Sequence, residues 1–232
     1  MTARPIPVGV RSAADDRAGT ASLVWVALIV IGVVGLVALT VALMAGVVFP
    51  FDRPIIDLAR TWTVPKIAWE GISQTANIPL IVLGVGFVAW LLWHRRFREA
   101  ILVILVLAAV TGGSEGVKQL TARPRPAGNG DGIPGVIYSY PSGHILECLT
   151  ILGMITLRVW RTTAHRRLAA VLVVLVAIEV VLVGIARIGL LEHYPTDLLG
   201  GLFGAIAALG VYAWLTRPGG WADRPPLHVR AT

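Results

Sequence analysis

Six long apolar segments, separated by short polar connections, dominate the pattern of hydrophobic and polar positions along the chain. Each segment is about 16 to 27 residues long, close to the roughly 20 residues that an α-helix needs to cross a bilayer. The segments span residues 22–48, 78–93, 100–117, 142–159, 168–185 and 195–215, and the second can begin as early as residue 71. This pattern predicts an all-α, polytopic membrane protein that folds as a bundle of six transmembrane helices.

The chain therefore divides into one membrane domain and two polar tails. Residues 22–216 form the predicted six-helix transmembrane domain. Residues 1–21 and 217–232 are predicted cytoplasmic tails, because an even number of crossings leaves both termini on one side. The first apolar run is far longer than the roughly 7–15 residues of a signal-peptide core, so we expect a retained helix. Between residues 51 and 76, apolar and charged positions mix, which predicts a short helix in the headgroup layer.

Composition and charge support this class of protein. Hydrophobic residues make up 56% of the chain, charged residues make up 14%, and the mean hydropathy is +0.78, which is rare for a soluble domain. The net charge of +7 suggests nucleic-acid binding, but most arginines lie in connections that share one side with the termini. These connections contain Arg95, Arg96, Arg98, Arg158, Arg161, Arg166 and Arg167. Since positive loops stay in the cytoplasm, we expect a multi-pass protein of the cell membrane with cytoplasmic termini and no nucleic-acid partner.

A first basic block follows the third apolar segment, at residues 118–126. Lys118 supplies a compact charge, and Arg125 supplies a planar fork that matches phosphate oxygens. Pro124 and Pro126 keep the backbone around Arg125 extended, which fixes the direction of its side chain. Two roles fit these residues alone: a phosphate site, or a basic helix end that lies on lipid headgroups.

The fourth apolar segment begins at residues 141–144, which read Pro-Ser-Gly-His. Ser142 is a good helix N-cap, and Gly143 lets a ligand approach the backbone closely. The free N–H groups and the positive end of the helix form an anion site. His144, in the first turn, would point toward the anion and could donate a proton to it. A capping serine beside an unrelated histidine would give the same four residues.

Residues 187–197 join the fifth and sixth segments and begin with Arg187. Pro195 suits the first turn of the last helix, so His193 lies just outside its N-terminus. Asp197 can accept a hydrogen bond from one imidazole nitrogen, which leaves the other basic and directed outward, as in an oriented nucleophile. A carboxylate–histidine pair can also be half of a metal site. No further cluster with ligand spacing accompanies this pair, and we expect no metal.

Four other carboxylates lie near these blocks or within the spans, and the first, Glu115, is three residues before Lys118 and can form an ion pair with it. Glu147 follows His144 by one turn and could either tune it or pair with an arginine. Glu179 lies in the middle of the fifth segment, where a charge is costly and often functional. Glu192, next to His193, is expected to face water.

Together, the three blocks resemble the type 2 phosphatidic acid phosphatase family in residue type, order and spacing. They read Lys, six residues, Arg-Pro; then Pro-Ser-Gly-His; then Arg, five residues, His, three residues, Asp. The resemblance extends over roughly residues 116–201, and six spans match the membrane branch of the family. Ala186 departs from the pattern, because the family usually has Ser before the arginine of the third block. This change removes one hydroxyl contact to phosphate, worth about 0.5–1.5 kcal/mol.

The resemblance implies a role for each residue of the three blocks. His193 would attack phosphorus and form a phosphohistidine, and Asp197 would orient its ring. His144 would protonate the departing oxygen and then activate water. The residues that would bind the phosphoryl oxygens are Lys118, Arg125, Ser142, Gly143 and Arg187. Because three cations would neutralise the phosphate charge, the resemblance implies a reaction without a metal or any other cofactor.

The resemblance also implies an integral membrane enzyme that hydrolyses a lipid phosphate or diphosphate at the outer leaflet, with its active site on the extracytoplasmic side. A prenyl diphosphate carrier lipid fits this orientation best. The nearest alternative substrates are phosphatidate and phosphatidylglycerol phosphate. Transfer of phosphate to a sugar or lipid hydroxyl, and non-catalytic binding of lipid phosphate, stay open as well. The expected partners are the lipid substrate and the bilayer, and the sequence leaves the oligomeric state open.

Overall fold

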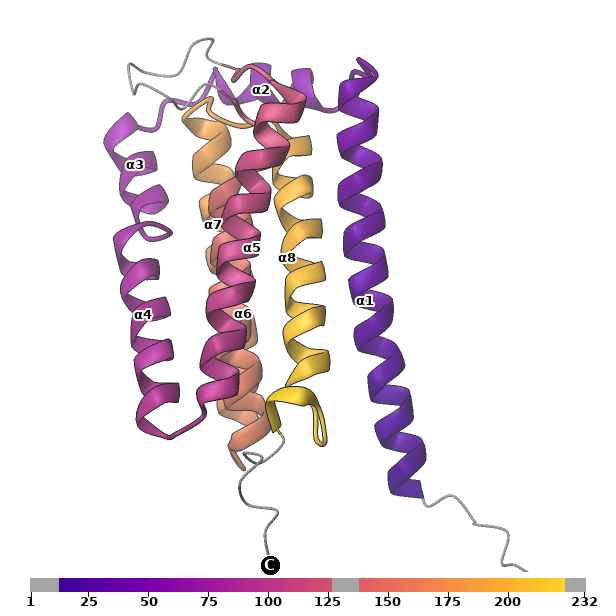
Figure 1. Ribbon diagram of the computed structural model, residues 1–232. Coiled ribbons are helices and arrows are strands. Elements are labelled where there is room, and N and C mark those ends of the chain that lie inside the picture. Colours follow the sequence, from indigo (N-terminus) through magenta and orange to yellow (C-terminus); the bar gives the residue numbers. More distant parts are fainter. Residues whose placement is uncertain (1–12, 127–137, 224–232) are drawn as a thin grey trace, which may run out of the picture.

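The computed structural model describes residues 13–126 and 138–223, with side chains from residue 22 onward (Figure 1). Its helices are α1 (Ala13–Met44), α2 (Asp52–Ala59), α3 (Lys66–Gln74), α4 (Ile78–Trp93), α5 (Phe97–Thr121), α6 (Gly143–Thr162), α7 (Arg166–Gly189), α8 (Pro195–Leu215) and the short 3-10 helix η1 (Trp221–Asp223). Within the described ranges, six helical segments are long and apolar enough to cross a membrane. The predicted all-α bundle of six transmembrane helices is therefore confirmed.

The first two spans differ in detail from the predicted ones. α1 begins at Ala13, so residues 13–21 of the predicted tail continue the helix, although the apolar span itself begins at Ser22 as expected. The second span begins at Lys66 and combines α3 and α4, with a break at residues 75–77. The helix breaks there because Pro79, in the first turn of α4, has no backbone N–H to donate to a carbonyl of the preceding turn. The outer parts of the predicted tails, 1–12 and 224–232, lie outside the described residues.

α8 packs against both α1 and α6, and small residues allow these helices to approach closely. A Cβ atom added to Gly204 of α8 would lie 2.8 Å from the Leu146 side chain of α6. One added to Gly32 of α1 would lie 2.5 Å from the backbone nitrogen of Ala207. Close approach through small residues is typical of helix pairs in membranes. The main buried apolar cluster lies between α4, α5, α6 and α8 and includes Leu91, Val103, Met154 and Ala205.

The three sequence blocks meet at one end of the bundle. α5 and α7 end there, α6 and α8 begin there, and α2 lies across this end (Figure 1). Ile56 and Ala59 of α2 are buried against Ile188 near the end of α7. The short helix expected between residues 51 and 76 is thus α2, and its apolar side fixes it to the bundle. At the opposite end of the bundle lie the first turns of α1 and the 3-10 helix η1 (Figure 1).

Candidate active site

The end of the bundle next to α2 brings the predicted site residues together. They are Lys118 in the last turn of α5, Arg125 just after α5, Ser142, Gly143 and His144 at the start of α6, Arg187 in the last turn of α7, and His193 and Asp197 around the start of α8. The charges of Lys118, Arg125 and Arg187 all act on His144. Three separate stretches of sequence therefore contribute to one cationic region around two histidines.

His193 is buried beside Asp197 at the start of α8. The His193 side chain is 3% exposed, and that of Asp197 is fully buried. The Nδ1 atom of His193 lies 3.6 Å from Oδ2 of Asp197, an ion-pair distance that is too long for the predicted direct hydrogen bond. The reason is that Asp197 caps α8: its Oδ2 atom accepts a hydrogen bond of 2.8 Å from the backbone N–H of Tyr194.

Burial keeps the imidazole of His193 neutral. Removal from water lowers the pKa of His193 from its usual 6.5 to about 4; Asp197 opposes this shift, and the positive charges of Arg187 and Arg125 add to it. At neutral pH the ring is therefore uncharged, as a nucleophile must be. The Nε2 atom of the ring lies 3.4 Å from Nη2 of Arg187, so Nε2 is the nitrogen that faces the cations.

Arg125 and Arg187 meet at the carboxylate of Glu192. The Oε2 atom of Glu192 lies 3.2 Å from Nη1 of Arg125 and also contacts Nη2 of Arg187. The exposed fractions of the side chains are 9% for Arg125, 8% for Arg187 and 22% for Glu192. The expectation that Glu192 faces water is therefore wrong. The turn after α7 directs its side chain back toward the two arginines instead.

A serine from a distant helix also contacts Arg187. The Nη1 atom of Arg187 donates a hydrogen bond of 3.1 Å to Oγ of Ser73, which lies on α3, 114 residues earlier in the chain. Ser73 is buried. Ala186, the residue directly before Arg187, is also buried and has no hydroxyl to offer. Arg187 thus obtains a hydroxyl partner from the second membrane span.

The start of α6 presents polar groups to the same region. The Oγ atom of Ser142 and the Nε2 atom of His144 are buried and have no hydrogen-bond partner among residues 13–126 and 138–223. A Cβ atom added to Gly143 would lie 3.8 Å from Nζ of Lys118, so the ammonium group lies next to the helix start. Unpaired donors, a positive helix end and a lysine together form a site suited to an anion.

Contacts with α8 position the start of α6. The backbone N–H of Ser142 donates a hydrogen bond of 3.0 Å to the backbone carbonyl of Asp197. A Cβ atom at Gly201 would lie only 2.6 Å from the backbone oxygen of Ser142, so a glycine is required at this approach. The close packing of α8 on α6 therefore places Ser142 and His144 beside His193.

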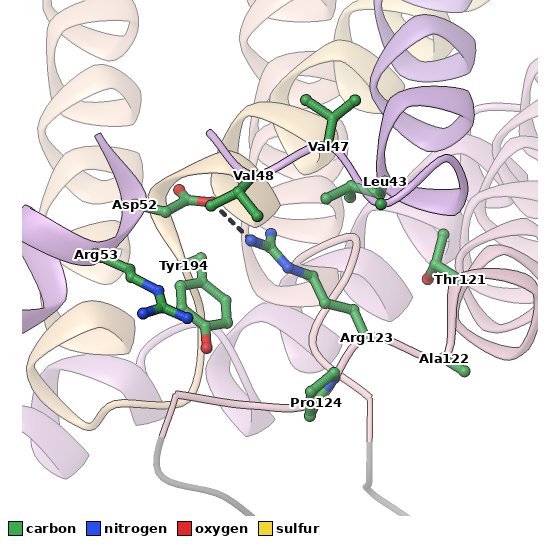
Figure 2. Close-up of a pocket in the computed structure, with 11 residues that line it drawn as sticks. Leu43, Val47, Val48, Asp52, Arg53, Thr121, Ala122, Arg123, Pro124 and Tyr194 are labelled. Atoms are coloured by element: carbon green, nitrogen blue, oxygen red, sulfur yellow. Dashed lines mark hydrogen bonds and ion pairs between the residues drawn. The ribbon is translucent and has the colours of Figure 1, made fainter. Parts of the chain in front are cut away.

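A second charge cluster, not foreseen from the sequence, lies directly behind Asp197. Arg123 binds two carboxylates: Nη1 lies 2.5 Å from Oδ1 of Asp197, and Nη2 lies 2.6 Å from Oδ2 of Asp52. Figure 2 shows the bridge to Asp52 at the wall of a cavity of about 260 Å³. Burial would lower the pKa of Arg123, but the carboxylates of Asp197 and Asp52 outweigh it and raise the pKa.

Asp52 completes this cluster by capping α8 from outside the helix. Its Oδ1 atom accepts hydrogen bonds from the backbone N–H of Thr196 at 3.0 Å and from the Thr196 hydroxyl at 2.7 Å. Asp52 begins α2, and Thr196 lies 144 residues later. We call Asp52, Arg123, Thr196 and Asp197 the internal charge cluster. The one sequence signal that could have drawn attention to Arg123 is that Arg123-Pro124 repeats the Arg-Pro pair that follows it.

The other carboxylates near the site have local partners. Glu147 accepts a hydrogen bond of 3.1 Å from Thr111, which supports neither of the two roles considered for it. Glu179 accepts one of 2.5 Å from Thr75 at the break between α3 and α4. Within the described ranges, no three His, Cys, Asp or Glu side chains are grouped so that they could bind a metal ion.

Comparisons with known proteins bear on the family and the fold of the chain. The family model of the PAP2 superfamily matches residues 99–219, which contain all three sequence blocks. Among solved structures, the chain is similar to the crystal structure of the first transmembrane PAP2-type phosphatidylglycerolphosphate phosphatase from Bacillus subtilis. The TM-score is 0.62 at 21% sequence identity, and the match covers 79% of this chain and 94% of that one. This likeness shows a shared fold. A comparison with curated proteins found no match.

Proposed function

Because the chain belongs to the PAP2 superfamily, we propose that it is an integral membrane lipid phosphatase that forms a phosphohistidine on His193 and needs no metal. One observation supports this most: Nε2 of the buried, neutral His193 faces Arg187, while Asp197 lies behind Nδ1. Binding of a phosphate requires cations but no buried imidazole backed by a carboxylate. The geometry therefore favours catalysis over a non-catalytic lipid-binding role.

In the first step, Nε2 of His193 attacks phosphorus, and a new N–P bond forms as the bond from phosphorus to the lipid oxygen breaks. Asp197 faces Nδ1 and stabilises the positive charge that develops on the ring. Protonated His144 gives its proton to the departing oxygen. A lipid monophosphate therefore leaves as an alcohol, and a lipid diphosphate leaves as a lipid monophosphate. The products of this step are the free lipid and a phosphohistidine.

In the second step, water replaces the imidazole on phosphorus. His144, now neutral, takes a proton from the water molecule, whose oxygen attacks phosphorus as the N–P bond breaks. Inorganic phosphate leaves, and both histidines return to their starting protonation states. A sugar or lipid hydroxyl in place of water would make the same site a phosphotransferase.

The surrounding donors stabilise the charge on the phosphoryl oxygens in both steps. Lys118, Arg125 and Arg187 supply three positive charges, and the start of α6 adds the Gly143 amide and the Ser142 hydroxyl. The side chains of Arg125 and Arg187 are buried, and Ser73 holds Arg187, so the two guanidinium groups need little reorganisation in the transition state. They can thus serve the purpose that magnesium ions serve in kinases.

The substrate that we propose first is a prenyl diphosphate carrier lipid. Three cations suit a diphosphate, which has more negative charge than a monoester. Phosphatidylglycerol phosphate is the main alternative, because the similar solved structure is that of a phosphatidylglycerolphosphate phosphatase. Phosphatidate is the third candidate.

We also propose that the site lies on the extracytoplasmic side of the cell membrane, with both termini in the cytoplasm. The site-bearing end of the bundle is opposite the end where α4 joins α5 and α6 joins α7 (Figure 1). These two connections contain or adjoin seven arginines, which favours a cytoplasmic position. A cysteine at Asn129 should therefore react with a membrane-impermeant thiol reagent added outside intact cells. Reaction only from the cytoplasmic side would reverse the assignment.

The reaction is tested with purified protein in detergent, supplied with a prenyl diphosphate, phosphatidylglycerol phosphate, phosphatidate and a soluble phosphate ester. We expect phosphate release from at least one lipid and no loss of activity in EDTA. His193→Ala should abolish release while the unfolding temperature stays near that of the wild type. Unchanged release by His193→Ala, or loss in EDTA that a divalent ion restores, would contradict the mechanism.

A further inference from the structure

The most unexpected contact in the site is the one between Glu192 and the two arginines, and it bears on how substrate enters and phosphate leaves. We propose that Glu192 is an internal competitor for the phosphate group: its carboxylate binds the donors of Arg125 and Arg187 that the substrate needs, and the substrate displaces it. This inference rests on the proposed function and adds a residue that limits anion affinity.

The backbone after α7 fixes Glu192 next to Arg187. The N–H of Leu191 donates a hydrogen bond of 2.9 Å to the carbonyl of Ile188, and the N–H of Glu192 donates one of 3.1 Å to the carbonyl of Arg187. Leu191 has a φ of 55°, in the left-handed region that this type of helix end requires. A leucine adopts that conformation at some cost. The position of Glu192 is thus set by the helix end and does not depend on a flexible loop.

The carboxylate uses donors that suit a phosphate oxygen. A single oxygen, Oε2 of Glu192, lies between Nη1 of Arg125 and Nη2 of Arg187. Carboxylate and phosphate oxygens form the same charge-assisted hydrogen bonds with guanidinium groups. Nη2 of Arg187 also lies 3.4 Å from Nε2 of His193. A phosphoryl group positioned for attack by His193 would therefore need the donor that Glu192 occupies.

Burial indicates which of the three groups moves. The arginine side chains are 9% and 8% exposed, and Ser73 also binds Arg187, whereas the Glu192 side chain is 22% exposed. The glutamate is thus the outermost member of the trio and can rotate toward solvent while the arginines stay in place. Once displaced, it still repels the anion, because it stays attached beside Arg187.

Such a competitor would weaken the binding of every anion, including the product. Inorganic phosphate is the second product of the proposed reaction, and three cations alone would retain it. Return of the Glu192 carboxylate to Arg125 and Arg187 would help expel phosphate at the end of each cycle. The residue would therefore limit product inhibition at the expense of substrate affinity.

The test compares wild type with Glu192→Gln, which keeps the shape and removes the charge. Affinity for inorganic phosphate is measured in detergent from the rise in unfolding temperature with phosphate concentration, a readout independent of turnover. We expect Glu192→Gln to bind phosphate about tenfold more tightly, since a charged carboxylate no longer competes for the donors of Arg125 and Arg187. Glu192→Asp, whose shorter side chain reaches the arginines less well, should fall between the two.

The matched control is Glu70→Gln, which removes a carboxylate that is 50% exposed and pairs with Lys66 on α3, outside the site. Its phosphate affinity should stay within about twofold of the wild type, because exposed charges interact weakly. Equal or weaker phosphate binding by Glu192→Gln and Glu192→Asp would overturn the competitor role and indicate that Glu192 positions the arginines.

The same measurements separate this inference from the proposed function. If the wild type hydrolyses lipid phosphates but Glu192→Gln binds phosphate no more tightly, the competitor role fails and the phosphatase stands. If no lipid phosphate is hydrolysed but Glu192→Gln binds phosphate more tightly, the enzyme proposal fails and Glu192 still competes for an anion site.

Discussion

Arg123 and Arg125 are two residues apart, yet they belong to charge clusters of opposite design. Arg123 is bound by two buried carboxylates, Asp52 and Asp197, so its positive charge is neutralised within the protein. Arg125 shares one carboxylate, that of Glu192, with Arg187, and nearby Lys118 pairs with the exposed Glu115, at 3.6 Å. In the internal charge cluster, two carboxylates balance the charge of one arginine. The cation cluster of Lys118, Arg125 and Arg187 has an excess of positive charge.

The two helix starts beside these clusters show the same contrast. The N-terminus of α8 is capped by protein carboxylates, because Asp52 accepts hydrogen bonds from Thr196 and Asp197 accepts one from Tyr194. At the N-terminus of α6, the Ser142 hydroxyl and His144 Nε2 have no partner within the described part of the chain. The two helix starts therefore have different roles: the start of α8 fixes His193 in position, and the start of α6 is available to a ligand.

Replacing Arg125 and Arg123 one at a time should have the largest effects, one on activity and the other on stability. Arg125→Ala is expected to lower kcat/KM by about 10²–10³-fold, because a donor to the transition-state charge is lost. The unfolding temperature should change little, since Glu192 keeps Arg187 as its partner. Steady-state kinetics and thermal unfolding in detergent measure both effects. A variant that unfolds but keeps its specific activity would assign Arg125 to structure.

Arg123→Ala should show the reverse pattern. It leaves Asp52 and Asp197 buried without a cation between them, which is expected to cost about 3–5 kcal/mol of stability. Denaturant or thermal unfolding measures this loss, and activity should fall only as the folded fraction falls or as His193 loses its alignment. Unchanged stability would mean that the internal charge cluster does not anchor α8.

Gly143→Ala tests whether the start of α6 faces a ligand. The added methyl group would meet Lys118 Nζ at 3.8 Å, an ordinary contact, so the fold has room for it. If substrate phosphate approaches this backbone, the methyl group should lower kcat/KM by roughly 10–100-fold without changing the unfolding temperature. Gly201→Ala is the contrasting variant, because its methyl group would clash with the Ser142 backbone and destabilise the protein. Full activity in Gly143→Ala would exclude close approach of the phosphate to α6.

Acid should weaken the fold through His193. Folding lowers the pKa of His193 to about 4, below the roughly 6.5 of an unfolded chain, so the unfolded state takes up a proton first as the pH falls. The stability that His193 contributes is complete above pH 6.5 and is lost progressively toward pH 4. We expect the unfolding temperature of the wild type to drop by several degrees more than that of His193→Gln over this range. Parallel curves for both proteins would show that the pKa of His193 is not lowered.

Ser73→Ala should have the smallest effect. Its hydroxyl accepts one hydrogen bond from Arg187, and loss of that contact should raise KM or lower kcat by about three- to tenfold. Ala186→Ser, which adds a hydroxyl next to Arg187, is the matched variant, and in the Ser73→Ala background it should restore part of the loss. No loss in Ser73→Ala would mean that the Ser73 hydroxyl does not position Arg187.

The sequence was sufficient to predict the helices and the residues that the site brings together, because both leave local patterns. Apolar runs of membrane-spanning length predict the spans, and the three blocks have distinctive residue types at fixed spacing. The partners of those residues were harder to foresee. Asp52 binds Arg123 across 71 positions, and Ser73 binds Arg187 across 114, so neither pair has a periodicity that a sequence could reveal.

Glu192 was misjudged for a related reason. A glutamate beside a histidine at a helix end is typical of an exposed position, and only the left-handed turn at Leu191 directs it inward. The distance from His193 to Asp197 shows a similar effect. Spacing of four residues places both on one side of the helix start, but the capping contact with Tyr194 draws the carboxylate away from the ring.

The most direct test of the central claim is to isolate the phosphoryl group on His193. We would use His144→Ala with a ³²P-labelled p-nitrophenyl phosphate ester, whose leaving group needs no proton, so that the first step proceeds while attack by water is slow. The expected result is close to one labelled phosphate bound covalently per protein, and none in His144→Ala with His193→Ala. Equal labelling of the double variant would contradict the assignment of His193 as the nucleophile.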